Sequence, residues 1–411
     1  MTIYTVHPEC IIDTAATSQR RRFHRCAPAR PAWLPLTLLF LCALLPCAPG
    51  RAASPRPLDQ ALREQIIMIP AGPAGEVALE TTVFRPPGPG PFPLLIINHG
   101  KQAGDPHLQA RDRFVYMASA FVRRGYAVLV PMRTGYARST GTYRDHGCDM
   151  RANGEAQAAD IADVIRYARG QGWIDSSRII AAGQSYGGLA TVALAAHPVP
   201  GLRGVLNFAG GLRSDDCDWQ GALVQAYASY GAGASVPSLW FYGANDSYFP
   251  PAQAQRMWKA YQQAGGRARL IAYGPFKRDA HVMLASRDGQ PVWLPQTDNF
   301  LRSIGMPARP VYAIAEPAPP APSNYAVLTD IEAVPFLSDS GRAAYRSFLQ
   351  RATPRAFAVS PSGAWGWAEQ GEDPNRRALD VCQGSSAEPC QLYSVDDSVV
   401  WPKDTASGRT D

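Results

Sequence analysis

The chain has little charge, and beyond the arginines at positions 20–30 its basic residues form no run. Only 18% of its 411 residues are charged, with 40 lysines and arginines against 34 aspartates and glutamates. No segment interleaves basic with aromatic side chains, which is the pattern expected of a chain that binds nucleic acid. The composition therefore gives no reason to expect a nucleic acid as partner.

Apolar runs of membrane length are also lacking. The run at residues 33–45 is shorter than the roughly 20 residues that a membrane-spanning helix needs. Arginines precede it and small residues follow, which is typical of a signal peptide cleaved between Ala48 and Ser54. We therefore expect residues 1–53 to be a leader, followed by an exported protein, periplasmic or secreted, with no stable membrane span.

Cysteine is sparse, and no C-x-x-C spacing of the kind found in zinc sites occurs. Beyond the predicted leader the chain holds four cysteines: Cys148, Cys217, Cys382 and Cys390. An even number in an exported protein predicts two disulfides, although four cysteines allow three connectivities. The local choice pairs Cys382 with Cys390 and leaves Cys148 for Cys217. We expect neither a metal ion nor an organic cofactor.

The most informative motif is Gly183-Gln184-Ser185-Tyr186-Gly187, a G-x-S-x-G sequence. An apolar strand-like run, residues 179–182, precedes it, and the apolar run 189–196 that follows is typical of a buried helix. This context predicts a nucleophile elbow, a strained turn that exposes the serine oxygen. Ser185 is the predicted nucleophile. The alternative is a Gly-Ser-Gly turn without chemistry.

Strand and helix patterns alternate through the first three quarters of the chain. This alternation predicts an α/β fold, in which a mostly parallel, doubly wound sheet is flanked by helices. We expect it to occupy residues 54–306. The predicted strands are 65–70, 77–84, 94–97, 127–130, 205–208, 238–242 and 268–273, and the predicted helices are 113–123, 155–169, 189–196 and 252–264.

After residue 306 the composition changes. Proline and alanine crowd residues 307–322, which is typical of a linker. Residues 323–411 carry two cysteines and several tryptophans, and they predict a small domain of short strands around a disulfide. No cluster of histidine, serine and acid occurs there, so we expect no catalysis from it. A role in holding a cell-envelope partner is the alternative.

A serine hydroxyl needs a base, and the base needs an acid that orients it. Asp246 follows the predicted strand 238–242, and His281 lies in a loop after the last predicted strand. The order Ser185, Asp246, His281 is that of the α/β-hydrolases. Asp279 is the rival acid, but its closeness in sequence to His281 makes the required approach to the ring awkward. The other candidate histidines are His107, His146 and His197.

Acyl transfer also needs donors for the developing oxyanion. The backbone N–H of Tyr186 is one expected donor. The second is expected from the loop at residues 98–102, with Lys101 as first candidate and Gln102 as second. In this interpretation His99 is structural and the lysine side chain takes no part.

Several of these segments together resemble a known family. RPPGPGPFPLLIINHG, RTGYARSTG, GQSYGG and LWFYGANDSYFPP, with the loop to His281, resemble the dienelactone hydrolase-like branch of the α/β-hydrolases, near the prolyl oligopeptidase-type hydrolases. The resemblance covers residues 63–304 and implies the fold and the triad, but not the substrate. Dienelactone hydrolases use a cysteine nucleophile, and Ser185 departs from that pattern.

The sequence thus predicts an exported serine hydrolase that cleaves a small-molecule carboxylic ester through an acyl-enzyme. Two alternatives stay open. One is an exported serine peptidase or acylaminoacyl hydrolase, since G-x-S-Y-G-G also occurs in that branch. The other is a binding protein without catalysis on a hydrolase fold.

Overall fold

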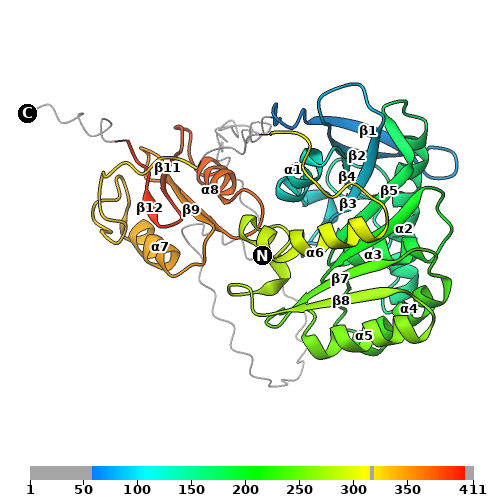
Figure 1. Ribbon diagram of the computed structural model, residues 1–411. Helices are drawn as coiled ribbons and strands as arrows, with labels where there is room; N and C mark the ends of the chain where they lie inside the picture. Colours follow the sequence, from blue (N-terminus) through cyan, green and yellow to red (C-terminus); the bar gives the residue numbers. More distant parts are fainter. Residues whose placement is uncertain (1–57, 315–318, 403–411) are drawn as a thin grey trace, which may run out of the picture. The chain divides into compact units, whose positions relative to one another are not determined.

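The computed structural model describes residues 58–314 and 319–402, so the predicted leader lies outside the described residues. Eight strands form one sheet in the order β1-β2-β4-β3-β5-β6-β7-β8 (Figure 1). β1 and β2 are antiparallel to their neighbours, and β3 to β8 pair in parallel. The strands are β1 (Gln65–Ala71), β2 (Val77–Phe84), β3 (Phe92–Asn98), β4 (Ala127–Pro131), β5 (Ile174–Gln184), β6 (Leu202–Phe208), β7 (Ser238–Gly243) and β8 (Ala268–Tyr273).

Helices cover both faces of this sheet, and the alternation of side chains along each strand explains why. In β3, Leu94 and Ile96 join one hydrophobic cluster while Leu95 and Ile97 join the other. The first cluster includes residues of α2 to α5, and the second includes residues of α1 and α6. These helices are α1 (Val115–Arg123), α2 (Met150–Arg169), α3 (Tyr186–Ala195), α4 (Trp219–Gly233), α5 (Pro251–Gln263) and α6 (Gln290–Ser303).

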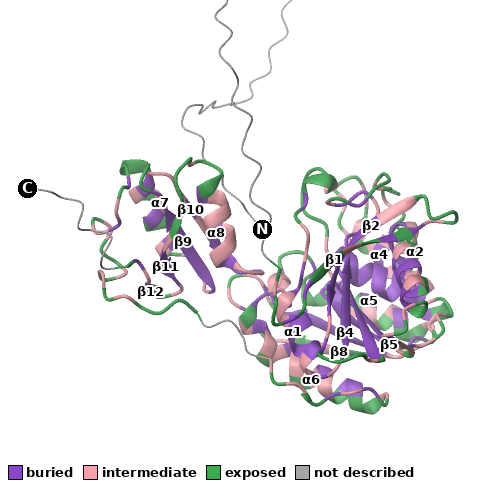
Figure 2. Ribbon diagram, turned by 90° about the horizontal axis from the view of Figure 1, so that it is seen from above, coloured by how far each residue is buried: buried purple, intermediate pink, exposed green. Residues whose placement is uncertain are grey.

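The burial pattern agrees with this layering. The central strands are buried along their length, whereas the helices expose their outer faces (Figure 2). Near-continuous burial is what a parallel sheet covered on both faces requires. The predicted α/β fold with a mostly parallel, doubly wound sheet is therefore confirmed.

Two helices of this part of the chain were not predicted. No helix is predicted after Cys217, but Asp218 accepts a hydrogen bond from the Gly221 N–H and starts α4. Glycine and tyrosine are frequent in α4 and weaken its helical pattern. α6 contains Pro295 in its interior, and a proline there predicts a helix break from the sequence alone.

A second, four-stranded antiparallel sheet lies in the C-terminal part, in the order β10-β9-β11-β12. Its cluster, centred on Tyr345, Phe357 and Tyr393, also includes Trp401, which is 4% exposed. The expected short strands are present, but two helices that were not predicted accompany them. The elements of this C-terminal part are α7 (Asp339–Leu349), β9 (Arg355–Val359), β10 (Trp365–Glu369), α8 (Pro374–Gln383), β11 (Gln391–Val395) and β12 (Ser398–Val399). In the preceding α/β part, short 3-10 turns occur at Pro106–Leu108, Ala280–Val282 and Arg287–Gly289.

The first half of the predicted linker contacts the first sheet's helices. The N–H groups of Val311 and Tyr312 both donate to the carbonyl of Arg123, at the end of α1. The Tyr126 hydroxyl donates to the carbonyl of Pro307. These bonds hold residues 307–312 against α1 and the loop before β4; where one domain ends and the next begins stays a prediction.

Both disulfides form with the pairing that the sequence favoured. Cys148 is bonded to Cys217 and Cys382 to Cys390. Cys148 and Cys217 each precede the aspartate that caps the next helix, so their bond joins the starts of α2 and α4. Among the described residues, no helix is both long and apolar enough to cross a membrane.

Candidate active site

Ser185 lies in a strained turn between β5 and α3. Its φ of 55° and ψ of −123° fall in a region that residues with side chains rarely adopt. The turn is held on both sides, because the Ser185 N–H donates to Phe208 O at 3.0 Å and the Gly211 N–H donates to Ser185 O at 3.0 Å. These bonds tie the turn to the carboxyl end of β6. The geometry is that of a nucleophile elbow.

The two glycines of the motif are required by close backbone approaches. A Cβ on Gly183 would lie 2.1 Å from the carbonyl oxygen of Gly187. A Cβ on Gly187 would lie 2.1 Å from the carbonyl oxygen of Asn98. Both distances are far below van der Waals contact, so any larger residue would push apart β5, α3 and the loop after β3.

Asp246 and His281 meet at the same sheet edge. The His281 Nδ1 lies 3.2 Å from both carboxylate oxygens of Asp246. The Asp246 side chain is fully buried, and its Oδ1 also accepts the N–H groups of Tyr248 at 2.8 Å and Phe249 at 2.9 Å. These two backbone donors hold the Asp246 carboxylate in place as an acceptor for His281 Nδ1, which can fix the imidazole tautomer with Nε2 free of its proton.

Asp279, the rival acid, faces the backbone rather than the ring. Its Oδ1 accepts the His281 N–H at 2.9 Å, and its Oδ2 accepts the Ser247 hydroxyl at 2.6 Å. Partial burial raises the pKa of Asp279, but the hydrogen bonds from Ser247 and from two backbone N–H groups outweigh it and lower the pKa overall. Asp279 therefore joins the loop of His281 to the loop of Asp246.

The histidine loop is also attached to the elbow. The Gln184 side chain, next to the nucleophile, donates its Nε2 to the carbonyl of His281 at 2.5 Å. Tyr248 stacks on the His281 ring with centroids 4.4 Å apart. No hydrogen bond from Ser185 to His281 is formed in the described part of the chain, and such bonds are often long before substrate binds.

The three candidate oxyanion donors differ in whether their backbone N–H already has a hydrogen-bond partner. The Tyr186 N–H is at the first position of α3, where an N–H has no partner within the helix. The Lys101 N–H follows Gly100, whose backbone lies against the nucleophile: a Cβ on Gly100 would be 3.9 Å from Ser185 Oγ. Gln102, the second candidate, already donates its N–H to Gln109 Oε1 at 3.0 Å, which disfavours it as a donor.

His99 is buried and its ring nitrogens are engaged within the fold. Its Nε2 accepts the Arg133 N–H at 3.1 Å, and Nδ1 lies 2.6 Å from the carbonyl oxygen of Gly100. Burial and the positive charge of Arg133 hold the pKa of His99 well below its ordinary value, so the ring is neutral. This is the structural role that the sequence predicts. The other rivals, His107, His146 and His197, are exposed.

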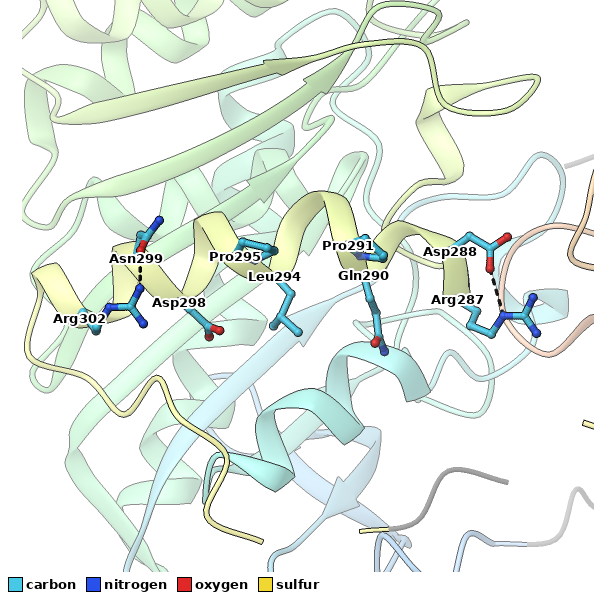
Figure 3. Close-up of a pocket in the computed structure, with 9 residues that line it drawn as sticks. All are labelled: Arg287, Asp288, Gln290, Pro291, Leu294, Pro295, Asp298, Asn299 and Arg302. Atoms are coloured by element: carbon cyan, nitrogen blue, oxygen red, sulfur yellow. Dashed lines mark hydrogen bonds and ion pairs between the residues drawn. The ribbon is translucent and has the colours of Figure 1, made fainter. Parts of the chain in front are cut away.

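Among the described residues no group of three or more His, Cys, Asp or Glu side chains could hold a metal ion. A groove of about 610 Å³ runs along α6, but no residue of the candidate triad lines it (Figure 3). Figure 3 shows Gln290, Leu294 and Asp298, spaced four residues apart, pointing to the same side of the helix. Arg287 and Asp288 pair with each other, so the groove carries no concentrated charge.

The family model of the X-Pro dipeptidyl-peptidases (S15 family) matches residues 74–226, less than half of the chain. The matched range contains the loop after β3 and the elbow, and it ends before Asp246 and His281. Comparison with curated protein sequences gives no match. The family match supports a serine hydrolase of the esterase or peptidase type. It does not decide whether the bond that is cleaved is an ester or a peptide bond.

Solved structures resemble the α/β part of the chain at a distance. A putative dienelactone hydrolase from Klebsiella pneumoniae is 20% identical with a TM-score of 0.43, over 59% of this chain and 98% of that one. A puromycin-hydrolysing peptidase of Mycobacterium tuberculosis is 18% identical with a TM-score of 0.44, over 60% of this chain and 40% of that one. An esterase from the Planctomycetes species Thermogutta terrifontis is also 18% identical, with a TM-score of 0.44, over 62% of this chain and 97% of that one. These likenesses are too distant to bear on the substrate.

Proposed function

We propose that this protein is an exported serine hydrolase that cleaves a carboxylic ester of a small molecule through an acyl-enzyme. The observation that carries the proposal is the meeting of three segments remote in sequence. Ser185 is presented on a strained elbow, and the buried Asp246 carboxylate holds His281 in a loop that Gln184 fastens to that elbow.

In this mechanism the Ser185 oxygen attacks the ester carbonyl while His281 Nε2 takes its proton. Asp246 stabilises the imidazolium that forms. The negative charge that develops on the carbonyl oxygen is stabilised by the Tyr186 and Lys101 N–H groups. His281 then gives the proton to the leaving alcohol, and water, activated by the same histidine, releases the acid. No step needs a metal or an organic cofactor.

A peptidase is the second candidate, because the family whose model matches residues 74–226 is one of peptidases. The same Ser185 chemistry cleaves amides, so the choice depends on substrate recognition rather than on the triad. A panel that pairs short aryl esters with X-Pro arylamides separates the two candidates. Turnover of the esters with no turnover of the arylamides supports the proposal. Efficient cleavage of the arylamides after X-Pro would show instead that the protein is a peptidase.

The nucleophile is tested with a fluorophosphonate probe on the wild type and on Ser185→Ala. We expect labelling of Ser185, located by mass spectrometry, and complete loss of labelling and turnover in the variant. A folded wild-type protein that neither labels nor turns over any substrate would favour a binding protein on a hydrolase fold.

Export is part of the same proposal and rests on the leader-like residues 1–53 together with the two disulfides. N-terminal sequencing of the protein recovered outside the cytoplasm tests it, with a first residue between 49 and 54 expected.

We also keep the proposal that the C-terminal sheet contacts a cell-envelope partner. Capture experiments with the full chain and with the chain shortened at residue 322 would test that contact.

A further inference from the structure

A buried glutamine outside every helix and strand holds the loop that follows β3. Gln109 is 5% exposed, and its side chain has four polar contacts, one of which places its Nε2 3.2 Å from Nδ1 of His99. Its Oε1 accepts the Gln102 N–H at 3.0 Å, and its Nε2 donates to Gly100 O at 3.3 Å and to Asp112 Oδ2 at 2.9 Å. One amide thus bonds the main chain on both sides of Lys101.

These partners leave one orientation for the Gln109 amide. Gly100 O and the Asp112 carboxylate accept hydrogen bonds, whereas the Gln102 N–H donates one. Exchanging the nitrogen and oxygen of the amide would set oxygen against two acceptors and nitrogen against a donor. The amide therefore acts as a two-ended clamp whose direction is set by its neighbours.

His99 reinforces the clamp at Gly100. Because His99 Nε2 accepts the Arg133 N–H, the proton of the neutral ring is on Nδ1. Nδ1 therefore donates to Gly100 O, 2.6 Å away. Two donors, one from His99 and one from Gln109, converge on this single carbonyl oxygen.

The direction of the Gly100 carbonyl determines the direction of the next N–H. In a trans peptide the C=O and the following N–H point to opposite sides of the chain. Fixing Gly100 O toward Gln109 and His99 therefore turns the Lys101 N–H away from them. Gly100 itself lies against the nucleophile, since a Cβ placed on it would be 3.3 Å from Ser185 Cβ.

We propose that Gln109 is a positioning residue, which holds the Gly100–Lys101 peptide so that the Lys101 N–H faces the oxyanion formed at Ser185. The inference rests on the proposed function, because it needs Ser185 to be the nucleophile. Gln109 acts through the main chain of residues 100–102 and does not touch the substrate. Nothing in the residues around position 109 signals this role, so sequence reasoning could not find it.

The test replaces Gln109 by methionine, which has a similar shape but cannot make these hydrogen bonds. For a short aryl ester that the wild type turns over, we expect kcat to fall about 10- to 100-fold with KM changed less than about twofold. A trifluoromethyl ketone, which forms a tetrahedral adduct with the serine, should bind more weakly by a similar factor. The matched control is Gln253→Met: Gln253 is equally buried and donates to Gln220 O, between α5 and α4.

A double-mutant cycle shows whether Gln109 acts through the Lys101 N–H. Lys101→Pro removes that N–H, so adding Gln109→Met to it should cost almost nothing further. Independent, multiplicative losses would overturn the proposal, as would Gln109→Met that keeps wild-type kcat and ketone affinity. Wild-type protein that fails to label at Ser185 would instead overturn the proposed function. Fluorophosphonate labelling of every variant keeps these two failures distinguishable.

Discussion

At the scale of single residues, the two carboxylates beside His281 have different partners. Asp246 bonds the ring at Nδ1, whereas Asp279 bonds the backbone N–H of the same histidine. Two aspartates near one imidazole therefore divide the tasks of orienting the base and of holding its loop. Only Asp246 faces the ring, and its side chain is completely buried.

Asp246→Asn and Asp279→Asn should have distinct effects. We expect Asp246→Asn to lower kcat by about 10⁴-fold, because an amide in that place favours the wrong tautomer of His281. Asp279→Asn should lower kcat by less than about tenfold and the free energy of unfolding by about 1 kcal/mol. Steady-state kinetics and urea unfolding of both variants measure the contrast. Equal losses of kcat would show that the acid has been assigned wrongly.

His99 predicts a dependence of stability on pH. Its pKa in the folded protein lies well below the ordinary value, so the unfolded chain takes up a proton first as the pH falls. The stability that the neutral ring contributes is complete above about pH 6.5 and is lost progressively below it, by at most about 1.4 kcal/mol per pH unit. His99 is the one fully buried histidine among the described residues.

Urea unfolding between pH 7.5 and 5.5 measures this dependence. NMR supplies the independent check, because the His99 ring resonances should not titrate in that range. A free energy of unfolding that is flat down to pH 5.5 would be at odds with a buried, neutral His99.

At the scale of elements, the backbone is strained where β5 joins α3. Ser185 keeps its unusual φ and ψ because β6 holds its N–H and Gly211 holds its carbonyl. Gly187 lets α3 approach the end of β3 closely. The elbow is therefore specified by three neighbouring elements and not by the motif alone.

Gly187→Ala tests that close approach. The added Cβ would meet Asn98 O at 2.1 Å, so we expect the free energy of unfolding to fall by about 1–3 kcal/mol and the oxyanion loop to shift. Gly172→Ala is the matched control, because a Cβ there meets nothing within 4 Å. Its stability should stay within about 0.5 kcal/mol of the wild type. Circular dichroism with urea unfolding and a kcat measurement cover both variants.

At the scale of the whole molecule, the disulfides differ in how much chain they close. Cys148 and Cys217 are 69 residues apart and join the starts of α2 and α4, at the edge of the sheet that carries Ser185. Cys382 and Cys390 are 8 residues apart and lie beside the second sheet. The longer loop constrains the unfolded chain more, so its bond should stabilise more.

Replacing each pair by alanine measures the difference. The chain-entropy relation gives a loss of about 4 kcal/mol for Cys148→Ala with Cys217→Ala, and about 2.5 kcal/mol for Cys382→Ala with Cys390→Ala. We predict that only the first pair also affects turnover, on the hypothesis that its bond braces the loops at the sheet edge that carries Ser185. Thermal unfolding and ester kinetics check both. Unchanged activity and stability without the first bond would end the idea of bracing.

The sequence by itself determined the local features of this protein. The apolar run before Gly183 and the glycines around Ser185 encode a strand, a tight turn and a helix within about fifteen residues, because steric limits act between near neighbours. The order Ser185, Asp246, His281 and the alternation of strands and helices likewise follow from local patterns. Most strand bounds differ from those predicted by three residues or fewer at each end.

Only the tertiary structure decided which groups meet. Asp246 rather than Asp279 reaches the His281 ring, the Gln102 N–H is taken by Gln109, and α4 forms although its sequence is a weak helix former. Each of these outcomes depends on the distance and direction between residues far apart in the chain. Packing of the helices on both faces of the sheet sets those distances, and no short stretch of sequence contains them.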